Sequence, residues 1–340
     1  MVYCLFHYWR CFLLLLILAV CTPIGRCASD SQPLENPWPR TAITLRWEND
    51  IIGGTDENYS NGISLSMTRR GRGLLGRVWD WVGLRDIETY YGYELGQIMI
   101  TPSDKSLLEP RPDDRPYAGI LYGSLSTMAR RENQLHGFKL VLGVVGPWSL
   151  AKETQIWWHE VVGSPRPMGW HHQLPNEPIL NLVYEYRRKY TLFGDRQGFG
   201  SELIPMAGAM AGNVLVQAEA GAQVRLGWHL PDDFGTTLIR GFGYQSLPRF
   251  DQQPAAAKWG AFLFGGVAGN AVARNLTLDG STFRSSPHVS KRPLFAAAEV
   301  GVGIWMRRLQ INASTVFWGR EFRTQERYSI FGALTVSVFF

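Results

Sequence analysis

The sequence predicts an all-β fold: a transmembrane antiparallel β-barrel of about 12 strands, with a short helix in an extracellular loop. Three observations predict it: an apolar N-terminal leader, strand-like alternation that recurs along the chain, and a final amphipathic strand that ends at Phe340. Beyond the leader, no run of about 18 apolar residues occurs, so helical membrane spans are not expected.

Residues 1–28 have the composition of a secretory signal peptide. Arg10 precedes an apolar run from Cys11 to Val20, and small and polar residues follow. The run is short for a membrane-spanning helix, and an uncleaved anchor is the alternative. All four cysteines of the chain lie in this leader, so the expected barrel domain, residues 29–340, is exported without a disulfide framework.

Alternation with a period of two predicts strands that are long enough to cross a membrane when tilted. In the last of them, Val336 and Val338 alternate with Thr335 and Ser337, a pattern that resembles the assembly signal of bacterial outer-membrane barrels. Thirteen tryptophans fit the aromatic girdles of such barrels. The expected strands lie near 41–49, 60–70, 90–99, 117–129, 135–146, 179–193, 199–211, 213–226, 257–272, 292–306, 308–319 and 327–340.

One segment breaks the alternation and predicts a helix over 149–163, in the loop between the fifth and sixth strands. Ser149 is the expected N-cap, and Gly163 ends the helix. Gln155 and His159 are four residues apart, so a helix presents both on one face.

Two kinds of chemistry are open to the histidines near this helix. His159 could act as a general base, with the Gln155 amide orienting a water or a carbonyl group. A structural role beside neighbouring tryptophans is the alternative for His159. His171 and His172, in "GWHHQL", are rival candidates for a base or a metal ligand.

The hairpin after the first strand, "RWENDIIGGTDENYSNGISLS", carries more carboxylates and amides than a turn requires. Asn49 and Asp50 stand at the end of the strand and offer hard oxygen ligands, which suit calcium. Ser60 begins the next strand, where its hydroxyl could orient water or act as a nucleophile. A solvated polar turn is the alternative for the whole hairpin.

Strand parity gathers three unusual segments on one rim. With both termini in the periplasm, the loops after the first, third and fifth strands all face the exterior. These loops contain the acidic hairpin, the segment "RPDDRPYAG" and the helix. Arg115 in the second of them could clamp its loop by pairing with Asp113 or Asp114, or it could hold a phosphate.

Together these segments resemble the lipid A 3′-O-deacylase family of outer-membrane barrels. The matching words are "ENDIIGGTDENYSNGISLS", "DDRPYAGILYGSL", "GPWSLAKETQIWWHEVVGSP" and "GWHHQL", with "GWHLPDDFG" and "VARNLTLDG" further along. The resemblance implies a twelve-stranded barrel and calcium-dependent hydrolysis of the 3′-acyloxyacyl group of lipid A. Carried over by position, it implies site roles for Asn49, Asp50 (calcium), Ser60, Arg115 (substrate), Gln155 and His159 (general base).

The sequence departs from the family pattern at two positions. Asp114 stands where a second basic residue is expected beside Arg115, and Arg166 stands where an acidic residue often follows the histidine. Glu160 and Glu177 are the alternatives for an acidic partner of His159.

We therefore expect a calcium-dependent lipid A deacylase in the bacterial outer membrane, with its site facing the outer leaflet. The alternatives are an outer-membrane phospholipase with Ser60 as nucleophile, and an inactive barrel or porin. The net charge of +5 is scattered, so nucleic acid is not an expected partner. The expected partners are lipid A and the membrane, and the expected state is a monomer.

Overall fold

The structure is a computed structural model, which describes residues 41–50, 58–84, 87–236 and 257–340. The expected signal peptide, 1–28, lies outside the described residues, as do Asp56 and Glu57 of the acidic hairpin. No helix in the described ranges is both long and apolar enough to cross a membrane.

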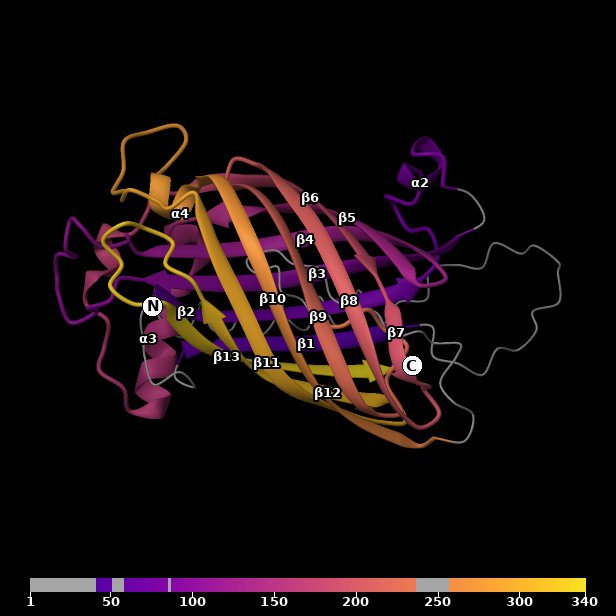
Figure 1. Cartoon of the computed structure of the whole chain (residues 1–340). Coiled ribbons are helices and arrows are strands. Elements are labelled where there is room, and N and C mark those ends of the chain that lie inside the picture. Colours follow the sequence, from indigo (N-terminus) through magenta and orange to yellow (C-terminus); the bar gives the residue numbers. More distant parts are fainter. Residues whose placement is uncertain (1–40, 51–57, 85–86, 237–256) are drawn as a thin grey trace. The chain divides into compact units, whose positions relative to one another are not determined.

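The described strands form one antiparallel sheet that closes on itself (Figure 1). Sequence neighbours pair except β6 and β7, which both pair with β8; the last strand pairs with the first, so the ring is complete. The strands are β1 (Thr41–Asn49), β2 (Asn58–Arg70), β3 (Glu88–Thr101), β4 (Ala118–Arg131), β5 (Gln134–Val145), β6 (Glu177–Arg188), β7 (Tyr190–Gly194), β8 (Phe199–Gly212), β9 (Leu215–Trp228), β10 (Trp259–Asn275), β11 (Leu294–Met306), β12 (Leu309–Trp318) and β13 (Ser329–Phe339).

The segments β6 and β7 run along β8 as a single strand interrupted at Lys189, so the barrel has twelve strands. This confirms the predicted fold, and each predicted strand end lies within three residues of the observed one. The agreement follows from the pleat, because alternation in a barrel wall records which side chains face in and which face out.

Side chains alternate between an apolar outer face and an inner face on which polar residues accompany a buried apolar cluster that includes Ile98, Ile120 and Val183. Leu263 and Val267 on β10 and Ile304 on β11 are exposed on the outside, as lipid-facing residues are. Inside, Glu94 of β3 accepts a hydrogen bond from Lys139 Nζ of β5 at 2.7 Å. Such pairs satisfy polar groups that the wall removes from water.

The segment 229–236, which follows β9, lies inside the lumen at the end opposite to α3. Asp232 forms ion pairs with Arg130 and Lys189, at 3.0 Å and 2.7 Å, and also with Arg196. The buried ring of Phe234 lies under the charged groups of Arg130 and Lys189. These partners come from β4, from the β6–β7 junction and from the β7–β8 turn, so the segment bridges distant parts of the wall.

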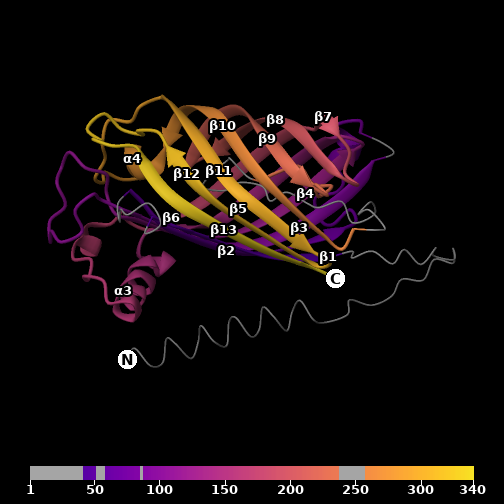
Figure 2. The ribbon, with the colours of Figure 1, turned by 60° about the horizontal axis from the view of Figure 1, so that its bottom comes forward.

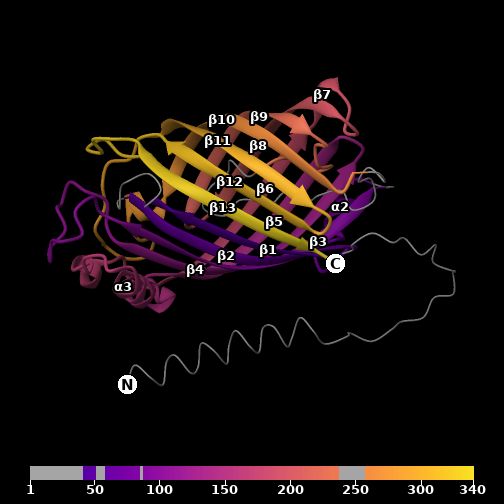
Figure 3. The same ribbon diagram turned by 90° about the horizontal axis from the view of Figure 1, so that it is seen from below.

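Helix α3 (Ala151–Val162) lies outside the barrel wall, as expected for the loop between β5 and β6 (Figures 2 and 3). It follows η2 (Pro147–Ser149) and precedes η3 (Gly169–His172), and the other described helices are α2 (Val78–Trp81) and α4 (Leu276–Asp279). Gly163 ends α3 in a left-handed conformation with φ 72°, as predicted. The predicted N-cap is wrong: Leu150 occupies that position, and it makes no side-chain capping bond.

Candidate active site between the barrel wall and helix α3

Helix α3 and the preceding η2 pack on the outward face of β1, β3 and β4. Trp158 of the helix meets Trp47 of β1 edge-on, with ring centroids 6.3 Å apart. Gln97 Nε2 of β3 donates to the carbonyl of Ser149 at 2.6 Å. Met99 joins a buried cluster with Tyr117, Ala151 and Trp170. The helix therefore creates a protected space on what is otherwise the lipid-facing side of the wall.

His159 lies in this space with a defined tautomer. Its Nδ1 is 2.6 Å from the carbonyl oxygen of Pro165, which can only accept, so Nδ1 carries the proton and Nε2 is the basic nitrogen. Burial lowers the pKa of His159, the Lys105 ammonium lowers it further, and the bond to Pro165 acts in the opposite direction. A neutral imidazole at physiological pH is what a general base requires.

Gln155 is held in one orientation by Trp170. The indole Nε1, which can only donate, lies 2.6 Å from Gln155 Oε1. The amide NH2 of the buried Gln155 is therefore the group that can donate to water or substrate. The predicted pairing of Gln155 and His159 on one helix face is confirmed, since both are among the buried residues of α3.

Changing Trp170 to Phe removes this orienting bond and keeps most of the buried ring. We expect kcat to fall about tenfold because the amide loses its fixed direction, with about 1 kcal/mol lost from the free energy of unfolding. Lipid turnover and urea unfolding in vesicles would measure the two effects. Trp148→Phe, at an exposed tryptophan of the same loop, is the matched control.

Asn49 and Asp50 are both buried at the end of β1. Asn49 shares the outward face of that strand with Trp47, which contacts α3. Ser60 joins them because the bulge between Tyr59 and Asn61 leaves Ser60 without a partner in the register, so that Ser60 and Asn61 both face outward. Its Oγ is 2.6 Å from Thr101 Oγ1 on the outward face of β3.

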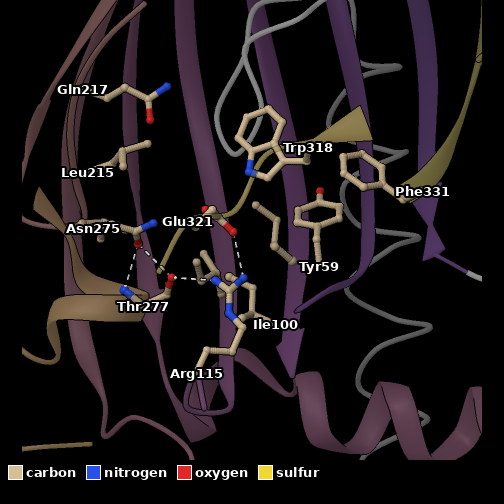
Figure 4. A pocket seen from close by; sticks show the side chains of 13 residues that line it. Tyr59, Ile100, Arg115, Leu215, Gln217, Asn275, Thr277, Trp318, Glu321 and Phe331 are labelled. Atoms are coloured by element: carbon tan, nitrogen blue, oxygen red, sulfur yellow. Dashed lines mark hydrogen bonds and ion pairs between the residues drawn. The ribbon is translucent and has the colours of Figure 1, made fainter. Parts of the chain in front are cut away.

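Arg115 lies on the other side of the wall. Its guanidinium points into a cavity of about 80 Å³ inside the barrel, also lined by Tyr59, Trp318 and Phe331 (Figure 4). Nη1 pairs with Glu321 at 2.9 Å, and Nη2 donates to Thr277 at 3.2 Å. The structure thus separates Arg115 from the group on α3, and the expected side-chain clamp to Asp113 or Asp114 is wrong.

The alternatives for a partner of His159 lie elsewhere. Glu160 is exposed, whereas Glu177 is buried and accepts hydrogen bonds from Asn213 and from the backbone of Thr282. His171 and His172 are exposed, and their rings contact each other at a tilt of 49°, with ring centroids 4.0 Å apart. The carbonyl of Pro165 therefore takes the orienting role for which the sequence suggested a carboxylate.

The polar side chains at the end of β1 include oxygen atoms of the type that binds a hard cation. Asp50 supplies a buried carboxylate and Asn49 an amide oxygen, both of which calcium accepts as ligands. In the part of the chain that the structure describes, no group of three or more His, Cys, Asp or Glu side chains could hold a metal ion. Further oxygens of the hairpin, in residues 51–57, lie outside the described residues.

Sequence reasoning missed Lys105, which the structure adds to the site. It lies in the loop between β3 and β4, and its Nζ atom is buried. Burial lowers the pKa of Lys105, and the Asp50 carboxylate raises it; burial has the larger effect, so that the pKa is about 8. The surrounding letters, "TPSDKS", are typical of a solvated loop and carry no signal for this position. Trp170 and Thr101 were missed for the same reason: their roles depend on contacts between distant segments.

Fold and site together define a class: an outer-membrane type of β-barrel with a candidate hydrolytic site on the outside of its wall. The family model described as "Outer membrane protein LpxR" matches residues 12–340. The chain therefore belongs to the LpxR family of outer-membrane proteins.

One solved structure of this family supports the fold, and a second match is weaker. LpxR from Salmonella typhimurium is similar with a TM-score of 0.67 at 21% sequence identity, covering 88% of this chain and 100% of that one. The β domain of the Bordetella autotransporter BrkA gives a TM-score of 0.41 at 8% identity, covering 89% and 99% of the two chains. A search of curated proteins gives no match.

Proposed function

We propose that this protein is a calcium-dependent hydrolase of the outer membrane that removes the 3′-acyloxyacyl group from lipid A. Membership of the LpxR family supports the substrate class. The observation that carries the chemistry is the bond from His159 Nδ1 to the Pro165 carbonyl, which fixes a basic Nε2 in a buried site outside the wall. In this proposal the site faces the outer leaflet.

In the proposed reaction, His159 is the one group that accepts and returns a proton. Nε2 of His159 takes a proton from water as the water oxygen bonds to the ester carbonyl carbon. The tetrahedral intermediate then breaks its bond to the 3′ oxygen of the sugar, and the imidazolium returns the proton to that oxygen. The products are a free 3′-hydroxyl and an acyloxyacyl carboxylic acid, so no covalent enzyme intermediate forms.

Neighbouring side chains orient the water and the ester. Gln155 donates from its NH2 group, and Asn49 and Ser60 contribute polar groups from the adjoining strands. When bound at Asp50, calcium would supply Lewis-acid polarisation of the carbonyl group and stabilise its oxyanion. We propose that the protein acts as a monomer.

The pH profile should follow the His159 base. Neutral imidazole is the active form, and its pKa lies below the ordinary value of 6.5. The base therefore stays deprotonated through neutral pH, and kcat is expected to fall only as pH drops through this lowered pKa. A profile of kcat against pH in mixed micelles would measure the acid limb, and a limb centred above 6.5 would contradict the assignment.

Mass spectrometry of lipid A tests the proposal. Purified full-length protein, refolded in detergent, would be incubated with lipid A in the presence of calcium or of a chelator. We expect loss of the 3′-acyloxyacyl mass with calcium and not with the chelator. Unchanged lipid A from a demonstrably folded barrel would reject the deacylase assignment, and equal turnover with the chelator would reject the metal.

The same experiment addresses the serine phospholipase. Cleavage of added phospholipid, together with labelling of Ser60 by a serine-directed reagent, would support a Ser60 nucleophile instead. The contact between Ser60 Oγ and Thr101 Oγ1 favours a positioning role. We therefore expect no label and no phospholipid turnover.

A further inference from the structure

The loop between β3 and β4 is closed by the residue that departs from the family pattern. Asp114 Oδ2 accepts hydrogen bonds from the Ser103 hydroxyl and from the Ser103 backbone N–H, the latter at 2.8 Å. Asp114 Oδ1 accepts from the backbone N–H of Arg115 at 2.7 Å. A basic side chain at 114 could accept none of these bonds. The carboxylate therefore shapes a loop that includes Lys105.

The same loop is tied to the segment that orients His159. The backbone N–H of Met168 donates to the carbonyl of Lys105 at 2.9 Å. Three residues earlier, the carbonyl of Pro165 accepts from His159 Nδ1 at 2.6 Å. Lys105 and the proposed base are thus both anchored to residues 165–168, through bonds that do not use the lysine side chain.

The Lys105 side chain extends into the site. Its Nζ atom is buried, and the ammonium interacts electrostatically with the Asp50 carboxylate and with the His159 imidazole. Arg115, the cation that the sequence predicts for substrate binding, is engaged with Glu321 inside the barrel. In the described structure, the positive charge that acts on Asp50 and His159 therefore comes from position 105.

We propose that Lys105 is a catalytic residue of the deacylase, whose ammonium stabilises the oxyanion that develops on the ester carbonyl. The inference rests on the proposed function. A carbonyl attacked by water at His159 must lie beside His159 and within reach of the cation site at Asp50, and Lys105 interacts with both residues. In a buried site this charge acts with little screening.

The test compares Lys105→Met with Lys105→Arg in the full-length, refolded protein. For Lys105→Met we expect kcat on lipid A to fall about a hundredfold with little change in KM, as on removal of one oxyanion donor. Lys105→Arg keeps the charge and should recover part of kcat. Lys152→Met, at a partly exposed lysine of α3, is the control and should behave as wild type. Heat-modifiable mobility on gels would confirm that each variant is a folded barrel.

Three results would overturn the inference. Full kcat in a folded Lys105→Met variant would remove the residue from catalysis. A raised KM with unchanged kcat would instead make it a binding site for a lipid A phosphate. A Lys105→Arg variant as slow as Lys105→Met would indicate a role in packing. If the wild-type protein were inactive, the result would contradict the proposed function itself. If the wild type were active and Lys105→Met equally active, the result would contradict only the role of Lys105.

Discussion

Changing His159 to Asn is expected to lower kcat for lipid A deacylation about a thousandfold, because the site loses the base that activates water. The asparagine keeps a polar group near the Pro165 carbonyl but has no basic nitrogen to accept a proton. Initial rates of 3′-acyloxyacyl release, measured by mass spectrometry at saturating substrate, would give the ratio of kcat values.

The control for this variant is Glu160→Gln, which changes the next residue of α3 at an exposed position. We expect it to retain wild-type kcat, since Glu160 points away from the buried face of the helix. A folded His159→Asn variant with more than about one tenth of wild-type kcat would show that another group is the base. The exposed pair His171 and His172 would then be the next candidates.

Replacing Asp232 with Ala should cost about 3–5 kcal/mol of unfolding free energy, the usual penalty for leaving buried charges without their partner. Three cations converge on this carboxylate inside the barrel: Arg130, Lys189 and Arg196. Arg130 and Lys189 are both buried, so their charges would remain in a low-dielectric environment. Urea unfolding in lipid vesicles, followed by tryptophan fluorescence, would measure the loss.

Glu109→Ala, at an exposed carboxylate in the β3–β4 loop, is the matched control and should change stability by less than about 0.5 kcal/mol. A similarly small effect of Asp232→Ala would show that segment 229–236 does not hold the wall together. The same proteins can be placed in planar bilayers, where the segment inside the lumen predicts no steady conductance for wild type. Open channels in wild type would revive the porin alternative.

The barrel could be predicted because the residue pattern within each strand shows which side chains face the lipid and which face the lumen. Period-two alternation gives the two faces of a wall, and strand length gives the span, so neither needs knowledge of distant contacts. The interruption at Lys189 was missed because a lysine at the end of a polar strand face looks ordinary in sequence. Its reason is tertiary: Lys189 turns to Asp232 and to the carbonyl of Asp233 inside the lumen.

The candidate site could be predicted only in part. Gln155 and His159 share a helix face by spacing alone, which local geometry dictates. The side of the wall that Arg115 faces is not encoded in its neighbours, because it precedes β4 in an irregular loop whose path depends on Glu321 and Thr277, far along the chain. The role of Lys105 could not be predicted for the same reason. Its position depends on a hydrogen bond to Met168, in a segment that the sequence does not place beside it.

In the proposed deacylation, the position of α3 outside the wall (Figures 2 and 3) lets the substrate reach the site from within the bilayer. A lipid embedded in the membrane can reach a site beside α3 by lateral diffusion, without entering the lumen or leaving its leaflet. The encounter is therefore two-dimensional, and the velocity should follow the mole fraction of substrate within the membrane rather than its bulk molarity. Adding inert lipid at constant total lipid A would then slow the enzyme by surface dilution, although no molecule of substrate had been removed from the sample.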